Sequence, residues 1–138
     1  MTSTLIDTNV FLDVVEARPQ WFEWSSRMVL GAKRSGDVII NPVVYAEASL
    51  PYQSEALFSK FVDDAGFLKE DLPWACAFIA AKAYHRYREK GGIKLTTLPD
   101  FFIGAHARVK SYKLLTRDIA RYRTYFPELN IIAPDTHS

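Results

Sequence analysis

Short apolar runs alternate along the chain with longer segments in which apolar residues recur every three or four positions. The short runs have the length and composition of buried strands and lie at residues 4–6, 37–41, 113–116 and 129–133. The longer segments have helical spacing and lie at residues 8–17, 20–37, 42–50, 54–66, 73–90, 98–111 and 117–126. This alternation predicts an α/β fold, with a parallel sheet covered by helices on both faces.

Several residues mark the expected ends of these helices. Pro42 and Pro73 suit a first helical turn, and Ser54 suits an N-cap. Gly36 and the pair Gly91-Gly92 are expected to end the helices that precede them. The chain has 138 residues, of which 49% are hydrophobic, and this is ordinary for one globular domain over residues 1–138.

Four acidic residues occupy positions that suggest a common site. Asp7 ends the first strand and Asp118 lies just beyond the third, so the carboxyl edge of a parallel sheet would bring them together. Glu47 and Asp100 lie on helix faces that also carry apolar residues, where a carboxylate is costly unless it is compensated. Each acid also has a structural explanation. The three aspartates could be helix N-caps, and Glu47 could reach water at the edge of its apolar face.

A shared site for these acids would favour a divalent cation. Carboxylates that lie close together repel one another, and some would take up protons unless a cation compensates them. Oxygen ligands suit Mg²⁺ or Mn²⁺. Such an ion can lower the pKa of a water molecule and offset the charge on a leaving oxygen, which is the chemistry of phosphodiester hydrolysis.

The order of these motifs resembles the PIN-domain nucleases, and in particular the VapC-type toxins of prokaryotic toxin–antitoxin pairs. The resemblance is carried by "LIDTNVFLD" (5–13), "INPVVYAEAS" (40–49), "LPDFFIGAHA" (98–107) and "LLTRDIARYRTYFP" (114–127). It implies a three-layer α/β/α sandwich with a central parallel sheet. It also implies a metal-dependent endoribonuclease that cuts single-stranded RNA regions and is neutralised by a cognate antitoxin.

The resemblance also assigns roles to individual residues. Asp7 and Asp100 would hold the main Mg²⁺ (or Mn²⁺), with Asp118 and Glu47 completing the catalytic pocket. The hydroxyl and amide groups of three neighbours would orient carboxylates or water; these are Thr8, Asn9 and Thr116. PIN toxins often pair as dimers, so the resemblance further implies a homodimer.

The distribution of charge fits an RNA substrate, although the net charge is only +1. Between Lys82 and Arg123 there are eleven basic residues and three acidic ones, which suits a polyanionic partner. Arg117 and Arg121 follow the third strand directly and are the best candidates for RNA contact. The single cysteine, Cys76, excludes an internal disulfide and fits a reducing cytoplasm. No apolar run has the length of a membrane span.

Two alternatives from other functional classes stay open. The chain could be a PIN-fold module that binds RNA or protein without cutting, which would account for the basic half but would not need all four acids. It could also be a phosphoaspartate protein, either a receiver module or a phosphatase. The phosphatase kind needs a second aspartate two residues after the first, where this chain has Asn9, and a receiver needs an early acidic pair.

Overall fold

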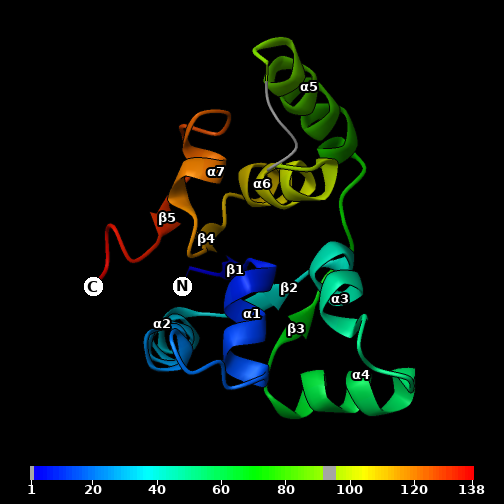
Figure 1. Ribbon diagram of the computed structural model, residues 1–138, viewed down its shortest axis with the longest axis vertical. Helices are drawn as coiled ribbons and strands as arrows, with labels where there is room; N and C mark the ends of the chain where they lie inside the picture. Colours follow the sequence, from blue (N-terminus) through cyan, green and yellow to red (C-terminus); the bar gives the residue numbers. More distant parts are fainter. Residues whose placement is uncertain (1, 92–95) are drawn as a thin grey trace.

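The fold is built on one parallel sheet. The computed structural model describes residues 2–91 and 96–138, and in that part of the chain five strands pair in the order β3-β2-β1-β4-β5 (Figure 1). The strands are β1 (Thr4–Ile6), β2 (Val38–Ile40), β3 (Leu68–Lys69), β4 (Lys113–Leu115) and β5 (Ile131–Ile132). In the centre, β1 pairs with both β2 and β4, and Leu5 stands opposite Ile39 on one side and Leu114 on the other.

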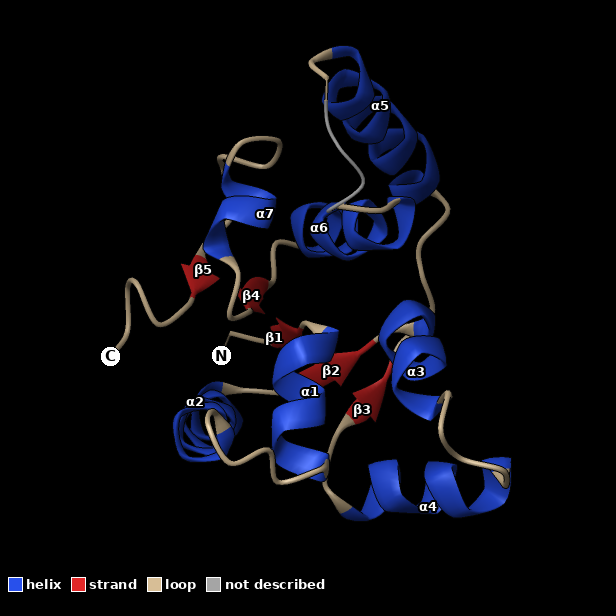
Figure 2. Ribbon diagram, in the orientation of Figure 1, coloured by secondary structure: helices blue, strands red, loops and turns tan. Residues whose placement is uncertain are grey.

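Helices connect the strands. They are α1 (Thr8–Val15), α2 (Phe22–Ser35), α3 (Pro42–Ser49), α4 (Glu55–Asp64), α5 (Ala75–Glu89), α6 (Leu98–Lys110) and α7 (Ile119–Arg123). In the packing of these helices, α1 lies on α2 and α3, α6 lies on α5 and α7, and α3 also contacts α6. Figure 2 shows α5, α6 and α7 above the sheet and α2 and α4 below it. This arrangement confirms the predicted three-layer sandwich with a central parallel sheet.

Burial explains why the strands are so apolar. All three residues of β1 and all three of β2 are buried, because helices cover both faces of a parallel sheet. Leu5, Ile6 and Leu115 are fully buried in the core. The backbone ladder continues past β1, since the Asp7 N–H donates to the carbonyl of Leu115. Asp7 is therefore fixed at the carboxyl edge of the sheet by the main chain.

The structure differs from the sequence prediction in several details. Strand β3 was not predicted, because both of its residues are exposed at the sheet edge and carry no apolar pattern. Helix α7 is shorter than the expected 117–126, because it begins after its N-cap Asp118 and ends at Arg123. The helix expected from Pro73 begins at Ala75 and ends at Glu89, so it stops just before Gly91 as expected; Gly92 lies outside the described residues. Within the described part of the chain, no helix is both long enough and apolar enough to cross a membrane.

Candidate active site

Three of the four acids lie at the carboxyl edge of the sheet. Asp7 follows β1 and is the N-cap of α1, and Asp118 follows β4 and is the N-cap of α7. Asp100 is the third residue of α6, where its side chain accepts from the backbone N–H of Thr97 in a capping box. Each aspartate therefore stabilises the N-terminal end of a helix, which is the structural explanation that the sequence analysis allowed. These roles hold the carboxylates at this edge and do not exclude a shared site.

Asp7 is the most deeply placed of the acids, with only 1% of its surface exposed. Its Oδ1 accepts from the Thr8 backbone N–H at 2.8 Å, and its Oδ2 accepts from the Thr116 hydroxyl at 2.8 Å. The side-chain amide of Asn9 donates to the same Oδ2 at 3.4 Å. Burial raises the pKa of Asp7, although the Thr116 hydrogen bond and the charge of Arg121 act against the shift. A nearby cation would therefore be favourable for this carboxylate.

Arg121 lies among the three aspartates. Its Nη1 is 3.4 Å from Oδ1 of Asp100 and 3.9 Å from Oδ2 of Asp7, and its Nη2 is 3.4 Å from Oδ2 of Asp118. Burial acts to lower its pKa, but the nearby acids, Asp100 first among them, raise that pKa above the ordinary value. The guanidinium is thus a permanent positive charge inside the acidic cluster. The structure brings Asp7, Asp100 and Asp118 together around it.

Glu47 is linked to this cluster through α1. Its Oε1 accepts from the Thr8 hydroxyl at 2.6 Å, and Thr8 also donates its backbone N–H to Asp7. The Thr116 hydroxyl has a similar linking position, because it donates to Asp7 and accepts from the Asp118 backbone N–H at 3.0 Å. Thr8 and Thr116 therefore each connect two of the acids, and Asn9 adds a bond to Asp7.

The donor chemistry of this cluster fits a divalent cation. Carboxylate oxygens are the ligands that Mg²⁺ and Mn²⁺ prefer. The buried hydroxyl of Tyr122 lies beside Asp7, and hydrogen bonding from it acts to lower the pKa of that carboxyl. Burial first, and then the charges of Asp7 and Asp100, raise the pKa of Tyr122 well above its ordinary value, so this hydroxyl is close to the acids and stays protonated. The carboxylate oxygens of this cluster are therefore suitable ligands for such an ion.

The acids are nevertheless spaced around Arg121 and do not converge on a common point. Across residues 2–91 and 96–138, no group of three or more His, Cys, Asp or Glu side chains is already gathered closely enough to hold a metal ion. The metal-ligand roles of Asp7, Asp100, Asp118 and Glu47 therefore stay predictions.

Arg117 has a structural contact that the sequence did not suggest. Its Nε is 2.7 Å from Oδ2 of Asp13, which is completely buried, and its guanidinium lies 5.1 Å from the ring centroid of Trp21. Ser25 donates to the same Oδ2 at 2.7 Å. Contact of Arg117 with RNA stays a prediction, but it would have to compete with this pair. Arg121, by contrast, lies at the acids themselves.

A second network, which sequence analysis missed, connects the two helices that carry Glu47 and Asp100. Asn41 caps α3 by accepting from the Val44 N–H, so its amide N–H is left to donate to Nδ1 of His106, 3.1 Å away on α6. His106 then carries its proton on Nε2, which lies 2.7 Å from Oε2 of Glu70. Burial lowers the pKa of His106, although Glu70 opposes the shift. The only signal in the sequence was a histidine on the apolar face of a predicted helix.

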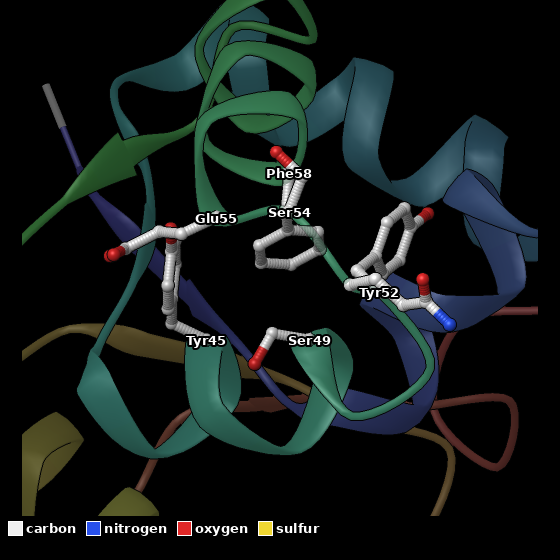
Figure 3. A pocket seen from close by; sticks show the side chains of 7 residues that line it. Tyr45, Ser49, Tyr52, Ser54, Glu55 and Phe58 are labelled. Atoms are coloured by element: carbon white, nitrogen blue, oxygen red, sulfur yellow. The ribbon is translucent and has the colours of Figure 1, made fainter.

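The cavities place one of the acids beside an apolar surface. A cavity of about 360 Å³ has Glu47 in its wall, and its remaining lining is apolar: Pro42, Val43, Ala46, Leu98, Pro99 and Phe102. Another cavity, of about 300 Å³, lies between α3 and the start of α4, where Tyr45, Tyr52 and Phe58 surround it (Figure 3). This second cavity has none of the four acids in its wall.

Comparison with known proteins identifies the family. The family model described as "PIN domain" matches residues 4–127. The chain belongs to the PIN domain family. The match contains all four acids and the helices and strands that position them. No curated protein matches the chain.

Solved structures with the same fold come from toxin–antitoxin complexes. A chain of the DNA-bound VapBC2 complex from Rickettsia felis superposes with a TM-score of 0.70 at 17% identity, covering 96% of this chain and 98% of its own. For VapBC-1 from nontypeable Haemophilus influenzae the TM-score is 0.72 at 14% identity, with the same coverage of 96% and 98%. For FitAcB from Neisseria gonorrhoeae it is 0.67 at 20% identity, covering 97% and 99%. Our PIN-domain chain therefore has the fold of these proteins over nearly its whole length.

Proposed function

We propose that this PIN-domain chain is a Mg²⁺- or Mn²⁺-dependent endoribonuclease of the VapC toxin type, with residues 1–138 forming one nuclease domain. The observation that carries the proposal is that Asp7, Asp100 and Asp118 each have a carboxylate oxygen within 3.9 Å of the Arg121 guanidinium, at the carboxyl edge of a parallel sheet. These acids come from three distant segments of the chain. Helix capping alone would explain the position of each aspartate, but it would not explain why all three lie around the same arginine.

Asp7 and Asp100 would hold the ion, and Asp118 and Glu47 would complete the pocket. When bound, a divalent cation supplies the Lewis acidity that makes water a nucleophile and offsets charge on the leaving oxygen. The chain's own residues keep the ligands in position. The Thr116 hydroxyl holds Oδ2 of Asp7, and the Thr8 hydroxyl holds Oε1 of Glu47.

The substrate would be single-stranded regions of RNA. An unpaired strand can bend so that one of its phosphates reaches the acidic cluster. Arg121 is the cation best placed to meet that phosphate, because it is among the acids and a quarter of its side chain is exposed. Such a substrate belongs to the cytoplasm, and we place the protein there.

The partner would be a cognate antitoxin. Solved structures with this fold are described as VapBC assemblies or as a toxin–antitoxin complex. Large apolar side chains are also exposed at the start of α5, where the N-cap Trp74 is 93% exposed and Phe78 in the first turns is 70% exposed. Exposed aromatic residues of this kind are typical of protein interfaces. We also propose that the protein forms a homodimer, because the VapC-type toxins that its sequence resembles often do.

The decisive experiment is RNA cleavage by matched variants. Asp7→Asn and Asp100→Asn each remove one ligand charge with little change in shape, and either should lower Mg²⁺-dependent cleavage by more than ~100-fold. Asp64→Asn removes an exposed carboxylate on α4 and should cleave as the wild type does. Circular dichroism would check that each variant is folded. Full activity in either site variant would reject the assignment.

The same preparation separates the alternatives. A non-catalytic binding module would bind RNA equally with and without Mg²⁺ and would cut none. A phosphoaspartate protein would be labelled by acetyl phosphate, and Asp7→Asn would abolish the label. The Asn9 amide lies 3.4 Å from the Asp7 carboxylate, in the position where the phosphatase kind would need an acid.

A further inference from the structure

The spacing of the acidic cluster suggests how many metal ions it uses. Arg121 lies within 3.9 Å of all three aspartates, and these contacts link β1, α6 and α7. No other basic side chain is recorded in an ion pair with these three acids among the described residues. The cluster is therefore built around one fixed cation that the chain supplies itself.

The charges balance if one divalent ion joins this arginine. Three ionised aspartates carry three negative charges, which one divalent ion and one guanidinium would neutralise together. Two divalent ions beside the same guanidinium would leave a buried excess of positive charge, which is costly. Glu47 does not change this balance directly, because it is held by Thr8 and is not recorded in a bond to Arg121.

The guanidinium is not held tightly by the acids. Strong hydrogen bonds between Arg and a carboxylate are about 2.7–2.9 Å long, whereas Arg121 makes one hydrogen bond to these acids, to Asp100 at 3.4 Å, and its contacts with Asp118 and Asp7 are ion pairs at 3.4 and 3.9 Å. The side chain is also 25% exposed, so its end can shift toward solvent without leaving the site. A phosphate that arrives from solvent would meet Arg121 as well as the ion.

We propose that Arg121 takes the place of a second metal ion: the site binds one divalent cation, and the guanidinium beside it binds the phosphate that is cut. The proposal rests on the proposed nuclease function and assigns Arg121 a catalytic role in it. A guanidinium that stabilises the charge growing on a phosphoryl group can contribute a large rate factor. The same positive charge should weaken metal binding, because it lies close to the ion.

Metal titration tests this without relying on cleavage. Mn²⁺ would be titrated calorimetrically into wild type, Arg121→Met and Arg121→Lys, with Arg123→Met as the control, since Arg123 is an exposed arginine on the same helix. We expect one ion per wild-type chain. Arg121→Met should bind Mn²⁺ about tenfold more tightly, Arg121→Lys should stay near the wild type, and Arg123→Met should change the affinity less than about twofold.

Cleavage at saturating Mn²⁺ gives the second measurement. Arg121→Met should cut RNA at least ~100-fold more slowly despite its tighter metal binding, and Arg121→Lys should recover part of the loss. Thermal unfolding with and without Mn²⁺ would show that each variant folds. Because Arg121→Lys keeps the positive charge, it tests the proposal even if the methionine variant proves unstable.

Three results would overturn the proposal. Binding of two ions per wild-type chain would remove the need for a substitute cation. Unchanged Mn²⁺ affinity in Arg121→Met would show that the guanidinium and the ion do not interact. Faster cleavage by Arg121→Met would show that the arginine blocks the site. If the affinity shift is found and no RNA is cut by the wild type, the shared-charge site stands and the nuclease function falls.

Discussion

The guanidinium of Arg117 forms an ion pair with the buried carboxylate of Asp13, with Nε 2.7 Å from Oδ2 and Nη2 3.2 Å from Oδ1. The pair joins the loop after β4 to the inner side of α1. The backbone N–H of Arg117 also donates to Asn9, next to the acidic cluster. This contact therefore stabilises the segment from which Thr116 and Asp118 enter the site.

Removing Asp13 should destabilise the fold strongly. Asp13→Ala would leave the Arg117 guanidinium and the buried Ser25 hydroxyl without their shared partner. Loss of one member of a buried pair commonly costs about 3–5 kcal/mol, and urea denaturation would measure it. Glu16→Ala is the control, because it breaks an exposed pair with Arg18 at the end of the same helix and should cost less than about 1 kcal/mol. Equal losses in the two variants would contradict the structural role of Asp13.

Replacing Asp7 should stabilise the fold in the absence of metal. Because burial raises the pKa of Asp7, the native state holds the proton more tightly than the unfolded chain does. The native state therefore loses stability as pH rises above the ordinary value of 3.8 and through the raised one. At neutral pH, Asp7→Asn removes this cost and can still cap α1, since asparagine is a good N-cap.

The measurement is urea denaturation with a chelator present, near neutral pH and again below about pH 4. We expect Asp7→Asn to gain about 0.5–2 kcal/mol near neutral pH, a common gain for a stabilising substitution, and little at the lower pH. Asp64→Asn, whose carboxylate is exposed, should show no such difference. A loss of stability near neutral pH would mean that the pairing of Asp7 with Arg121 outweighs its burial.

Much of the fold and part of the site could be predicted from sequence. The central strands are short apolar runs, so their parallel order and the placement of Asp7 and Asp118 at one edge followed from general rules. Glu47 and Asp100 stood out because they interrupt apolar helix faces. Strand β3 could not be predicted in this way, because two exposed residues at a sheet edge leave no apolar pattern.

The contacts of individual charged residues could not be predicted. Arg117 and Arg121 are four residues apart and both followed a strand, so both were expected to meet RNA. In the structure Arg117 is paired with Asp13, more than a hundred positions earlier, and Arg121 lies among the acids, while RNA contact by either residue stays a prediction. The spacing of residues along a helix or strand predicts which way a side chain points. Its ion-pair partner depends on how distant segments of the chain pack together. His106 shows the same limit, since its partner Glu70 follows the strand that was missed.

Acid should destabilise the protein through His106. Burial lowers the pKa of this histidine below its ordinary value of 6.5, so the unfolded chain takes up the proton first. The contribution is fully present above that value and is lost as pH falls toward the lowered pKa of the native state. Thermal unfolding at a series of pH values from about 7 to about 5 should show this loss.

Two histidine variants separate this effect from others. His106→Gln should flatten the dependence over that interval, while lowering stability at neutral pH because the bonds to Asn41 and Glu70 are disturbed. His85→Gln is the control, since His85 is exposed on α5 and should leave the dependence as it is. An unchanged dependence in His106→Gln would assign the acid sensitivity to carboxylates such as Glu70, whose own pKa is lowered by Tyr112 and His106 in spite of its burial.

The contact between Gly104 and Phe126 should tolerate no added atom. A Cβ at Gly104 would lie 2.5 Å from Cε2 of the Phe126 ring, closer than real atoms pack, and that ring is itself buried against Phe101. Gly104→Ala should therefore cost about 1–3 kcal/mol in urea denaturation, the usual range for overpacking.

Gly31→Ala supplies the opposite case. Gly31 lies in α2 with nothing within 4 Å of an added Cβ, so alanine should gain up to about 1 kcal/mol through its helix propensity. Gly104 is also in a helix, so both substitutions gain the same free energy from helix propensity. They differ only in how much space surrounds the added Cβ atom. If Gly104→Ala gained stability as Gly31→Ala does, Phe126 would have to move freely, and this contact would not hold α6 against the segment that follows α7. Since Asp100 lies one turn before Gly104, the position of that acid depends on the same packing.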